Sequence, residues 1–251
     1  MGTRPRELRV FALEGIPEVE EGDDLAALIA DATERAGGLE DGDVVVVAHK
    51  VVSKAEGRVR RVEDVEATER AVELAGGERD PRHVQAILDE AARVVRSRPP
   101  LVIAETRHGF VCASAGVDAS NAKGPGTLVL LPLDPDESAV RLRDGLSART
   151  GRVVGVIVTD SFGRAWRQGT TDIALGVAGV TALLDLRGVR DGAGYELHAT
   201  QIAVADEIAG AAELVLGKTS GNPAAVVRGL GVTGSGSGRD LVMPPERDLF
   251  R

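Results

Sequence analysis

Two uninterrupted apolar runs constrain most strongly what this chain can fold into. The first is a run of four valines at 44–47, within the segment 43–48, and the second is RVVGVIVT at 152–159. A strand with one face in water alternates apolar and polar residues, whereas a strand covered on both faces is apolar throughout. Both runs therefore predict strands that are buried on both faces of a sheet.

Other segments show either strand length or helical spacing. We expect further strands at 8–13, 101–104, 110–113 and 127–131. Apolar residues recur at helical spacing after Asp23 and Asp24, after Asp80-Pro81, at 139–150 and at 200–216. We expect the apolar stripe of the second of these helices to continue to Val94 and Val95, and the Gly- and Ser-rich segment 231–239 to form a mobile loop. These patterns predict a mixed α/β or α+β fold whose topology stays open.

The composition excludes several classes of protein. The net charge of −9 argues against nucleic-acid binding, which needs clustered Lys and Arg. Cys112 is the only cysteine, so an intrachain disulfide and a cysteine-based metal cage are excluded. No apolar run approaches the ~20 residues that span a bilayer, and the amino end lacks the apolar core of a signal peptide. We expect a cytoplasmic enzyme or binding protein without a membrane partner, with a core of Ala, Val, Leu and Ile because aromatic residues make up only 2%.

Polar clusters after the predicted strands are candidate sites. In the segment 53–58, Lys54 follows the first buried run and can meet a phosphate as a compact point charge, although a solvated loop explains the cluster as well. Asp118, Ser120 and Asn121 offer the oxygen ligands that suit Mg²⁺ or Mn²⁺, and a turn uses the same residue types.

A third cluster, Thr159-Asp160-Ser161-Phe162-Gly163-Arg164, comes at the end of the second buried run. Ligands gather at the carboxyl ends of strands in open α/β sheets, so a carboxylate with a neighbouring hydroxyl can hold a metal against a phosphate there. The competing interpretation makes Asp160 the N-cap of a following helix. The sequence leaves both open.

A Gly-Lys-Thr triplet at 217–219 is similar to the end of a P-loop. The upstream glycines lack the required spacing and the triplet follows a predicted helix, so a Walker-type site is a poor interpretation. The loop can still offer backbone amides to phosphate. The histidines lack metal-ligand spacing, and we expect surface or structural roles for His49, His83, His108 and His198.

Taken together, the sequence resembles the coenzyme F420:L-glutamate ligase family. The resemblance rests on eight blocks, among them LEGIP, VVSKAEGR, AGVDASN and TDSFGRAWR. The blocks occur in family order and together extend over nearly the whole chain. By number, the blocks are 13–17, 22–25, 51–58, 115–121, 131–136, 159–167, 204–209 and 225–229.

The resemblance implies a reaction and an assembly. GTP phosphorylates the terminal carboxylate of coenzyme F420-0 or F420-1, the amine of L-glutamate attacks the acyl phosphate, and a γ-glutamyl amide forms as GDP and phosphate leave. It implies Mg²⁺ or Mn²⁺, with K⁺ as a further cation, and a two-lobed fold that forms an intertwined homodimer. Longer actinobacterial members continue into a flavin-binding reductase-like domain. We therefore expect 1–251 to be the ligase domain alone, either a stand-alone enzyme or a fragment.

Site residues are carried over from the family by motif. Asp118 and Asp160 are implied to be catalytic and to bind the divalent metal, with the Ser161 hydroxyl completing the set. Lys54 and Asn121 are implied nucleotide contacts, as are His49 and Lys50, which stand where relatives often carry small hydroxyl residues. The residues implied to line the nucleotide site are Ile16, Pro17, Glu18, Val19, Val215, Leu216, Gly217, Lys218, Thr219, Ser220, Gly221 and Asn222.

Two other functions use the same residues. A metal-dependent nucleotide phosphohydrolase would need the same carboxylates but no acceptor amine. A nucleotide-binding protein without catalysis would need only the phosphate contacts. The joint presence of Asp118, Asp160, Ser161 and Lys54 argues against the second alternative.

Overall fold

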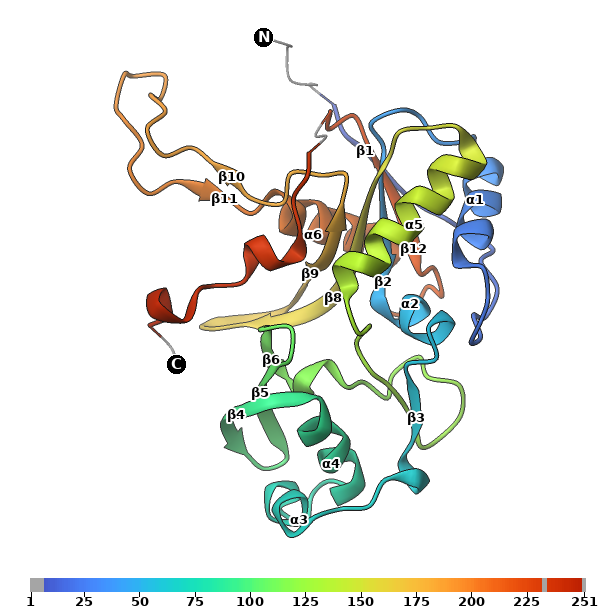
Figure 1. The fold of residues 1–251 in the computed structure, drawn as a ribbon, viewed down its shortest axis with the longest axis vertical. Coiled ribbons are helices and arrows are strands. Elements are labelled where there is room, and N and C mark those ends of the chain that lie inside the picture. Colours follow the sequence, from blue (N-terminus) through green and yellow to red (C-terminus); the bar gives the residue numbers. More distant parts are fainter. Residues whose placement is uncertain (1–6, 232–233, 250–251) are drawn as a thin grey trace.

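A five-stranded sheet in the order β1-β12-β2-β8-β9 forms the centre of the molecule (Figure 1). The computed structural model describes residues 7–231 and 234–249. β2 and β8 are parallel, and every other neighbouring pair is antiparallel. The two buried runs predicted from the sequence are thus adjacent strands. The strands are β1 (Arg9–Ala12), β2 (Val44–Ala48), β8 (Gly155–Arg164), β9 (Arg167–Ala178) and β12 (Ala224–Arg228).

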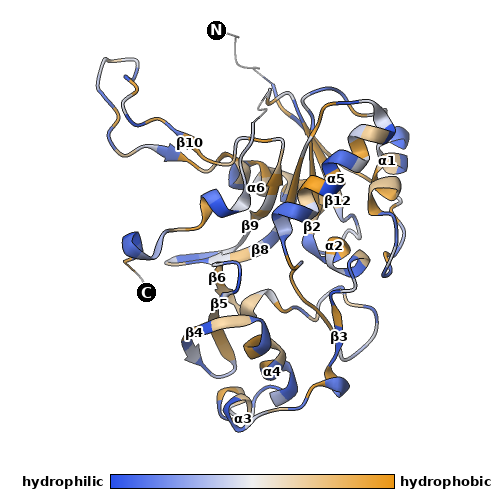
Figure 2. Ribbon diagram, viewed as in Figure 1, coloured by the Kyte–Doolittle hydropathy of each residue, from blue (hydrophilic) through white to orange (hydrophobic). Residues whose placement is uncertain are grey.

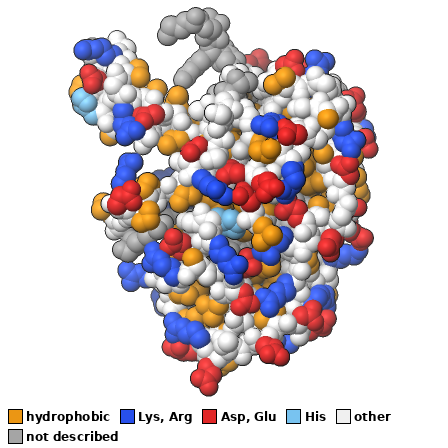
Figure 3. All heavy atoms as spheres, viewed as in Figure 1, with side chains coloured by type: hydrophobic (Ala, Val, Ile, Leu, Met, Phe, Trp, Pro, Cys, Tyr) orange, Lys and Arg blue, Asp and Glu red, His pale blue; other side chains and the backbone are white. Residues whose placement is uncertain are grey.

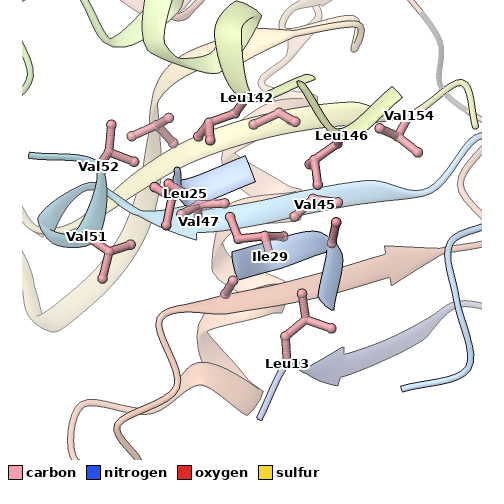
Figure 4. Close-up of a cluster of buried hydrophobic side chains, with 14 of the residues drawn as sticks. Leu13, Leu25, Ile29, Val45, Val47, Val51, Val52, Leu142, Leu146 and Val154 are labelled. Atoms are coloured by element: carbon pink, nitrogen blue, oxygen red, sulfur yellow. The ribbon is translucent and has the colours of Figure 1, made fainter. Parts of the chain in front are cut away.

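Helices cover both faces of this sheet, as the apolar runs require. Val45 and Val47 point into one core, where they meet Ile29 and Leu146 from two helices (Figure 4). Val44 and Val46 point into the opposite core. The helices on the first face are α1 (Leu25–Arg35), α2 (His49–Ala55) and α5 (Pro135–Thr150), and α6 (Val204–Leu216) covers the second. In Figure 2 the central strands are mostly hydrophobic, while the helices carry hydrophilic residues as well.

Small side chains let these layers approach closely, which explains how a core with few aromatic residues packs well. α6 places Ala205, Ala209 and Ala212 against the sheet. A Cβ atom on Gly176 of β9 would lie 2.0 Å from the carbonyl oxygen of Pro135 at the start of α5. Close packing of this kind excludes larger residues at the contact.

A second, smaller core lies between β2 and α5 in the sequence. Leu74, Ile87, Val102 and Leu128 pack together there, away from the five-stranded sheet. Its elements are β3 (Val59–Arg61), α3 (Glu69–Ala75), α4 (Pro81–Glu90), β4 (Ala91–Arg98), β5 (Leu101–Thr106), β6 (Val111–Ala113) and β7 (Thr127–Val129). Phe110 and Cys112 join Phe162 and Leu175 of the central sheet in a further cluster.

Shorter elements complete the described chain. β10 (Leu184–Asp185) and β11 (Gln201–Ile202) form a two-stranded ribbon beside α6 (Figure 1). The 3₁₀ turns are Val62–Asp64, Ser114–Gly116, Gly238–Leu241 and Pro245–Arg247. No helix in the described part of the chain is long and apolar enough to span a membrane. On the face shown in Figure 3, Lys and Arg side chains are interspersed with Asp and Glu.

Several predicted boundaries were wrong because tertiary pairing overrides local pattern. The helix predicted after Asp80-Pro81 ends at Glu90. Val94 and Val95, which were predicted to extend its apolar stripe, belong to β4, and β4 pairs with β5. β9 was not predicted, and its pairing carries β8 past residue 159 to Arg164. The late helix begins at Val204, because Gln201 and Ile202 pair with β10.

The Gly- and Ser-rich segment 231–239, predicted to be a mobile loop, includes residues 232–233, which lie outside the described residues. Beyond them, Ser237 and Asp240 form a capping box at the start of a 3₁₀ turn. Gly238 is buried, and a Cβ there would lie 2.1 Å from the carbonyl oxygen of Leu175. This part of the segment therefore packs against β9.

Candidate functional site

A cavity of about 540 Å³ opens where the parallel strands β2 and β8 end. Most of the residues predicted for the site line this cavity. They are residues 16–19, 49, 50, 54, 121, 160, 161, 216–218, 221 and 222. The predicted residues that are not among its described lining residues are Asp118, Val215, Thr219 and Ser220. Segments far apart in the sequence thus meet at the strand ends, where open α/β sheets hold ligands.

Helix α2 supplies two lysines to this cavity. It begins at His49 directly after β2, and Lys50 and Lys54 are four residues apart, on the same side of the helix. Each lysine is only 8% exposed. The Nζ atom of Lys54 donates to Oε1 of Glu18 at 2.5 Å. The solvated-loop interpretation of Lys54 is therefore wrong.

Asp118 lies beside the cavity and is held by a buried cation. Its Oδ2 accepts a hydrogen bond from Nζ of Lys50 at 2.5 Å, and its Oδ1 accepts from the backbone N–H of Ser120 at 2.7 Å. Burial opposes ionisation of Asp118, but these hydrogen bonds and the charge of Lys50 outweigh it and lower the pKa to about 2. The turn predicted at Asp118 is confirmed by its hydrogen bond to the N–H of Ser120, whereas its role as a metal ligand stays a prediction.

Asp160 is more deeply enclosed than Asp118. Its Oδ1 lies 3.5 Å from Nε2 of His49, a side chain that is 1% exposed, so His49 is no surface histidine. Burial acts to raise the pKa of Asp160, but the neighbouring His49, the N–H of Ser161 and the charge of Lys50 together lower it. No helix begins here, because β8 continues through Asp160, and the N-cap interpretation is wrong.

Asp172 is a carboxylate of the cavity that the sequence analysis missed. Its Oδ1 accepts from the hydroxyl of Ser161 at 2.6 Å, and its Oδ2 lies 3.1 Å from the hydroxyl of Thr159. Burial and the charge of Asp160 raise the pKa of Asp172, against these hydrogen bonds. Asp172 lies opposite Ser161 on β9, so finding it required that strand to be recognised.

The loop after α6 forms another wall of the cavity. Gly217 ends the helix with a φ of 60°, and Gly221 has a φ of 77°, in the range that favours glycine. Lys218 directs its Nζ to the hydroxyl of Ser161 at 3.4 Å. This geometry confirms that the Gly-Lys-Thr triplet follows a helix, as the sequence predicted.

The donor set fits a divalent cation that is shared with phosphate. Asp118 and Asp160 both lie close to Lys50, whose ammonium offsets their charge, and Ser161 adds a hydroxyl. Among the described residues, no group of three or more His, Cys, Asp or Glu could enclose a metal ion. Mg²⁺ is commonly held by one or two carboxylates together with phosphates and water, so the two carboxylates suffice for such an ion.

Charged side chains of both signs line the cavity. The lysines are Lys50, Lys54, Lys123 and Lys218, and the carboxylates are Glu18, Asp160, Asp172 and Glu213. Ammonium groups of this kind bind phosphates as point charges. With Asp160 in the cavity and Asp118 beside it, such groups could supply the positioning and charge neutralisation that phosphoryl transfer requires.

Comparisons with known proteins identify a family for this chain. The model of the family described as F420-0:Gamma-glutamyl ligase matches residues 15–229. The coenzyme F420:L-glutamate ligase of Archaeoglobus fulgidus is 46% identical over 97% of this chain and 96% of its own length. Ligases with the same name from Methanopyrus kandleri and Haloarcula marismortui are 45% and 43% identical, over 97% of this chain and 99% and 96% of their own lengths.

Proposed function

The chain belongs to the F420-0:Gamma-glutamyl ligase family and is a ligase, and we propose that it joins L-glutamate to coenzyme F420-0, and to F420-1, with GTP as the phosphoryl donor. The observation that carries this proposal is the convergence of four lysines with Asp160 at one cavity, with Asp118 held beside it by Lys50. That arrangement suits a nucleoside triphosphate bound together with a divalent cation, Mg²⁺ or Mn²⁺. We propose K⁺ as a further cation and assign no residue to it.

The proposed reaction has two steps. A carboxylate oxygen of the coenzyme precursor attacks the γ-phosphorus of GTP, and GDP leaves with the electron pair of the broken P–O bond. The amine of L-glutamate then attacks the carbonyl carbon of the acyl phosphate, a proton leaves the nitrogen, and phosphate is expelled. The product is a γ-glutamyl amide.

Different residues of this chain have different roles in the proposed reaction. Lys54, Lys218 and the backbone amides of 218–221 bind the phosphates, and the segment 16–19 lines the same cavity. Asp118, Asp160 and the hydroxyl of Ser161 would hold the divalent cation, which supplies charge neutralisation at the phosphates when bound. Lys50 keeps Asp118 ionised and oriented through its 2.5 Å hydrogen bond.

We expect the purified chain to form a glutamylated product only when GTP, Mn²⁺ or Mg²⁺, L-glutamate and the coenzyme precursor are all present. Mass spectrometry of the product and a parallel assay of GDP measure this. In calorimetric titration, GTP should bind roughly tenfold more tightly than ATP.

The controls separate the alternatives. A phosphohydrolase releases GDP equally well without L-glutamate, and a non-catalytic nucleotide-binding protein releases none. Equal or tighter binding of ATP removes the proposed nucleotide preference but leaves the ligase reaction standing.

We also propose that the chain forms a homodimer with a two-lobed, intertwined architecture, on the basis of family membership. In equilibrium ultracentrifugation at micromolar concentration, it should sediment at twice the 26.2 kDa mass of one chain. A single species at the monomer mass over that range would remove the dimer from the proposal.

A further inference from the structure

Arg79 is a half-buried cation with neutral partners, outside the cavity described above. Its NH1 donates to the hydroxyl of Ser114 at 3.2 Å, and its NH2 lies 2.9 Å from Nε2 of His83. Among the residues that the structure describes, no carboxylate forms an ion pair with it. Burial lowers the pKa of Arg79, and the more distant Asp118 opposes this.

Other shielded arginines of this protein are neutralised directly. The side chains of Arg58 and Arg228 are each 19% exposed, and they bind Glu90 at 2.7 Å and Asp43 at 2.8 Å. A guanidinium that is withdrawn from water costs free energy unless an anion compensates it. Arg79 departs from this pattern, so its charge is available to an anion that is not part of the described chain.

His83 contributes to that availability. Burial and the charge of Arg79 lower the pKa of His83 to about 4, so the ring is neutral at neutral pH. A neutral imidazole can accept a hydrogen bond from Arg79 through Nε2 and holds the guanidinium without cancelling its charge. Two of the five N–H donors of Arg79 are thereby directed to Ser114 and His83, which leaves the others for a ligand.

The position of Arg79 links it to the reaction centre. Asp118 is close enough for its charge to act on both Arg79 and His83, and Asp118 in turn binds Lys50, which lines the cavity. Ser114, the partner of Arg79, lies at the start of the turn that leads to Asp118. A ligand on Arg79 would therefore lie at the turn that leads to Asp118, without being the nucleotide in the cavity.

We propose that Arg79, oriented by His83 and Ser114, binds a carboxylate of an acid substrate next to Asp118, an inference that rests on the proposed ligase function. A planar guanidinium matches a carboxylate through paired N–H donors. The reacting carboxylate of the precursor must face the γ-phosphate, whereas L-glutamate reacts through its amine and keeps its carboxylates free. L-glutamate is therefore the expected ligand.

The test compares Arg79→Gln and Arg79→Lys with the unchanged chain. With GTP and the precursor saturating, the KM for L-glutamate should rise about tenfold or more in Arg79→Gln, the effect of removing a charged hydrogen-bonding partner. Arg79→Lys should recover only part of this loss. The KM for GTP should stay within twofold. A purely structural cross-link between α4 and the turn at Ser114 would lower stability but would not act on one substrate alone.

Arg70→Gln is the matched control, because Arg70 is exposed on α3 of the same core and pairs with Glu73. Its KM values should equal those of the unchanged chain. A rise in the KM for the precursor instead of L-glutamate assigns the carboxylate to the precursor. Unchanged KM values for both acids in a folded, active Arg79→Gln overturn the subsite.

Calorimetric titration with L-glutamate, and separately with the precursor, keeps this inference distinct from the proposed function. If the unchanged chain binds one acid and Arg79→Gln binds it at least tenfold more weakly, the subsite stands even where no ligation occurs. If the unchanged chain ligates and both proteins bind the acids equally, only the subsite fails. If the unchanged chain neither binds an acid nor ligates, both proposals fail.

Discussion

Replacing Asp160 by Asn should lower the rate of glutamate ligation by about 100-fold or more while the chain stays folded. The substitution keeps the shape of the side chain but removes the negative charge that is proposed to hold the divalent cation. Phosphates and an attacking carboxylate repel one another, so the barrier rises when that cation is lost. The amide also removes a buried charge, which is why folding should survive.

Steady-state ligation at saturating Mn²⁺ measures this effect, and Mn²⁺ binding followed by electron paramagnetic resonance reports on the cation independently of turnover. Asp185→Asn is the control, since Asp185 pairs with Arg187 at the surface and does not line the cavity. Its activity should be unchanged. Near-normal ligation by a folded Asp160→Asn would remove Asp160 from the catalytic assignment.

Replacing Asp43 by Ala should lower the free energy of unfolding by about 3 kcal/mol or more. Asp43 is 1% exposed and accepts hydrogen bonds from Nε and NH2 of Arg228 at 2.9 and 2.8 Å. It also accepts from the backbone N–H of Glu40 at 2.8 Å. Its removal leaves the guanidinium of Arg228, on the neighbouring strand β12, with the exposed Glu40 as its one carboxylate partner among residues 7–231 and 234–249.

Urea denaturation followed by circular dichroism gives this difference, provided that the dependence of the unfolding free energy on urea is unchanged. Glu73→Ala is the control, because Glu73 forms an exposed ion pair with Arg70, and such pairs contribute about 0 to 1 kcal/mol. A loss below about 1 kcal/mol for Asp43→Ala would show that the buried pair is not a major source of stability.

Family membership could be recognised from the sequence because it rests on ordered local motifs. The blocks around Lys54, Asp118 and Asp160 occur in family order, and the comparisons confirm the resemblance. The cavity then brings together most of the residues carried over by motif, including 16–19 and 216–218. Their proposed roles at the nucleotide and the metal stay predictions.

The parts of the site that could not be predicted depend on strand pairing and on contacts between distant segments. Asp172 reaches Ser161 only because β9 folds back on β8. Arg79 and Ser114 are brought together when α4 packs against the turn that precedes Asp118. Nothing in the local sequence around either residue signals its partner.

The sequence by itself determined the elements whose stability is local. The four valines of β2 and the run in β8 were recognised as doubly covered strands, because burial on both faces demands uninterrupted apolar residues. Asp24 and Asp80 were recognised at helix starts, where their carboxylates accept N–H groups of the first turn.

Only the tertiary structure decided which face and which partner each remaining residue has. Val94 and Val95 fit a helical stripe in the sequence, yet pairing with β5 makes them part of a strand. Lys54 looked like part of a loop, but α2 buries it beside Glu18. The physical reason is the same in both cases. Hydrogen bonds and burial supplied by distant segments outweigh propensities worth less than about 1 kcal/mol per residue, and local sequence does not encode where those segments come from.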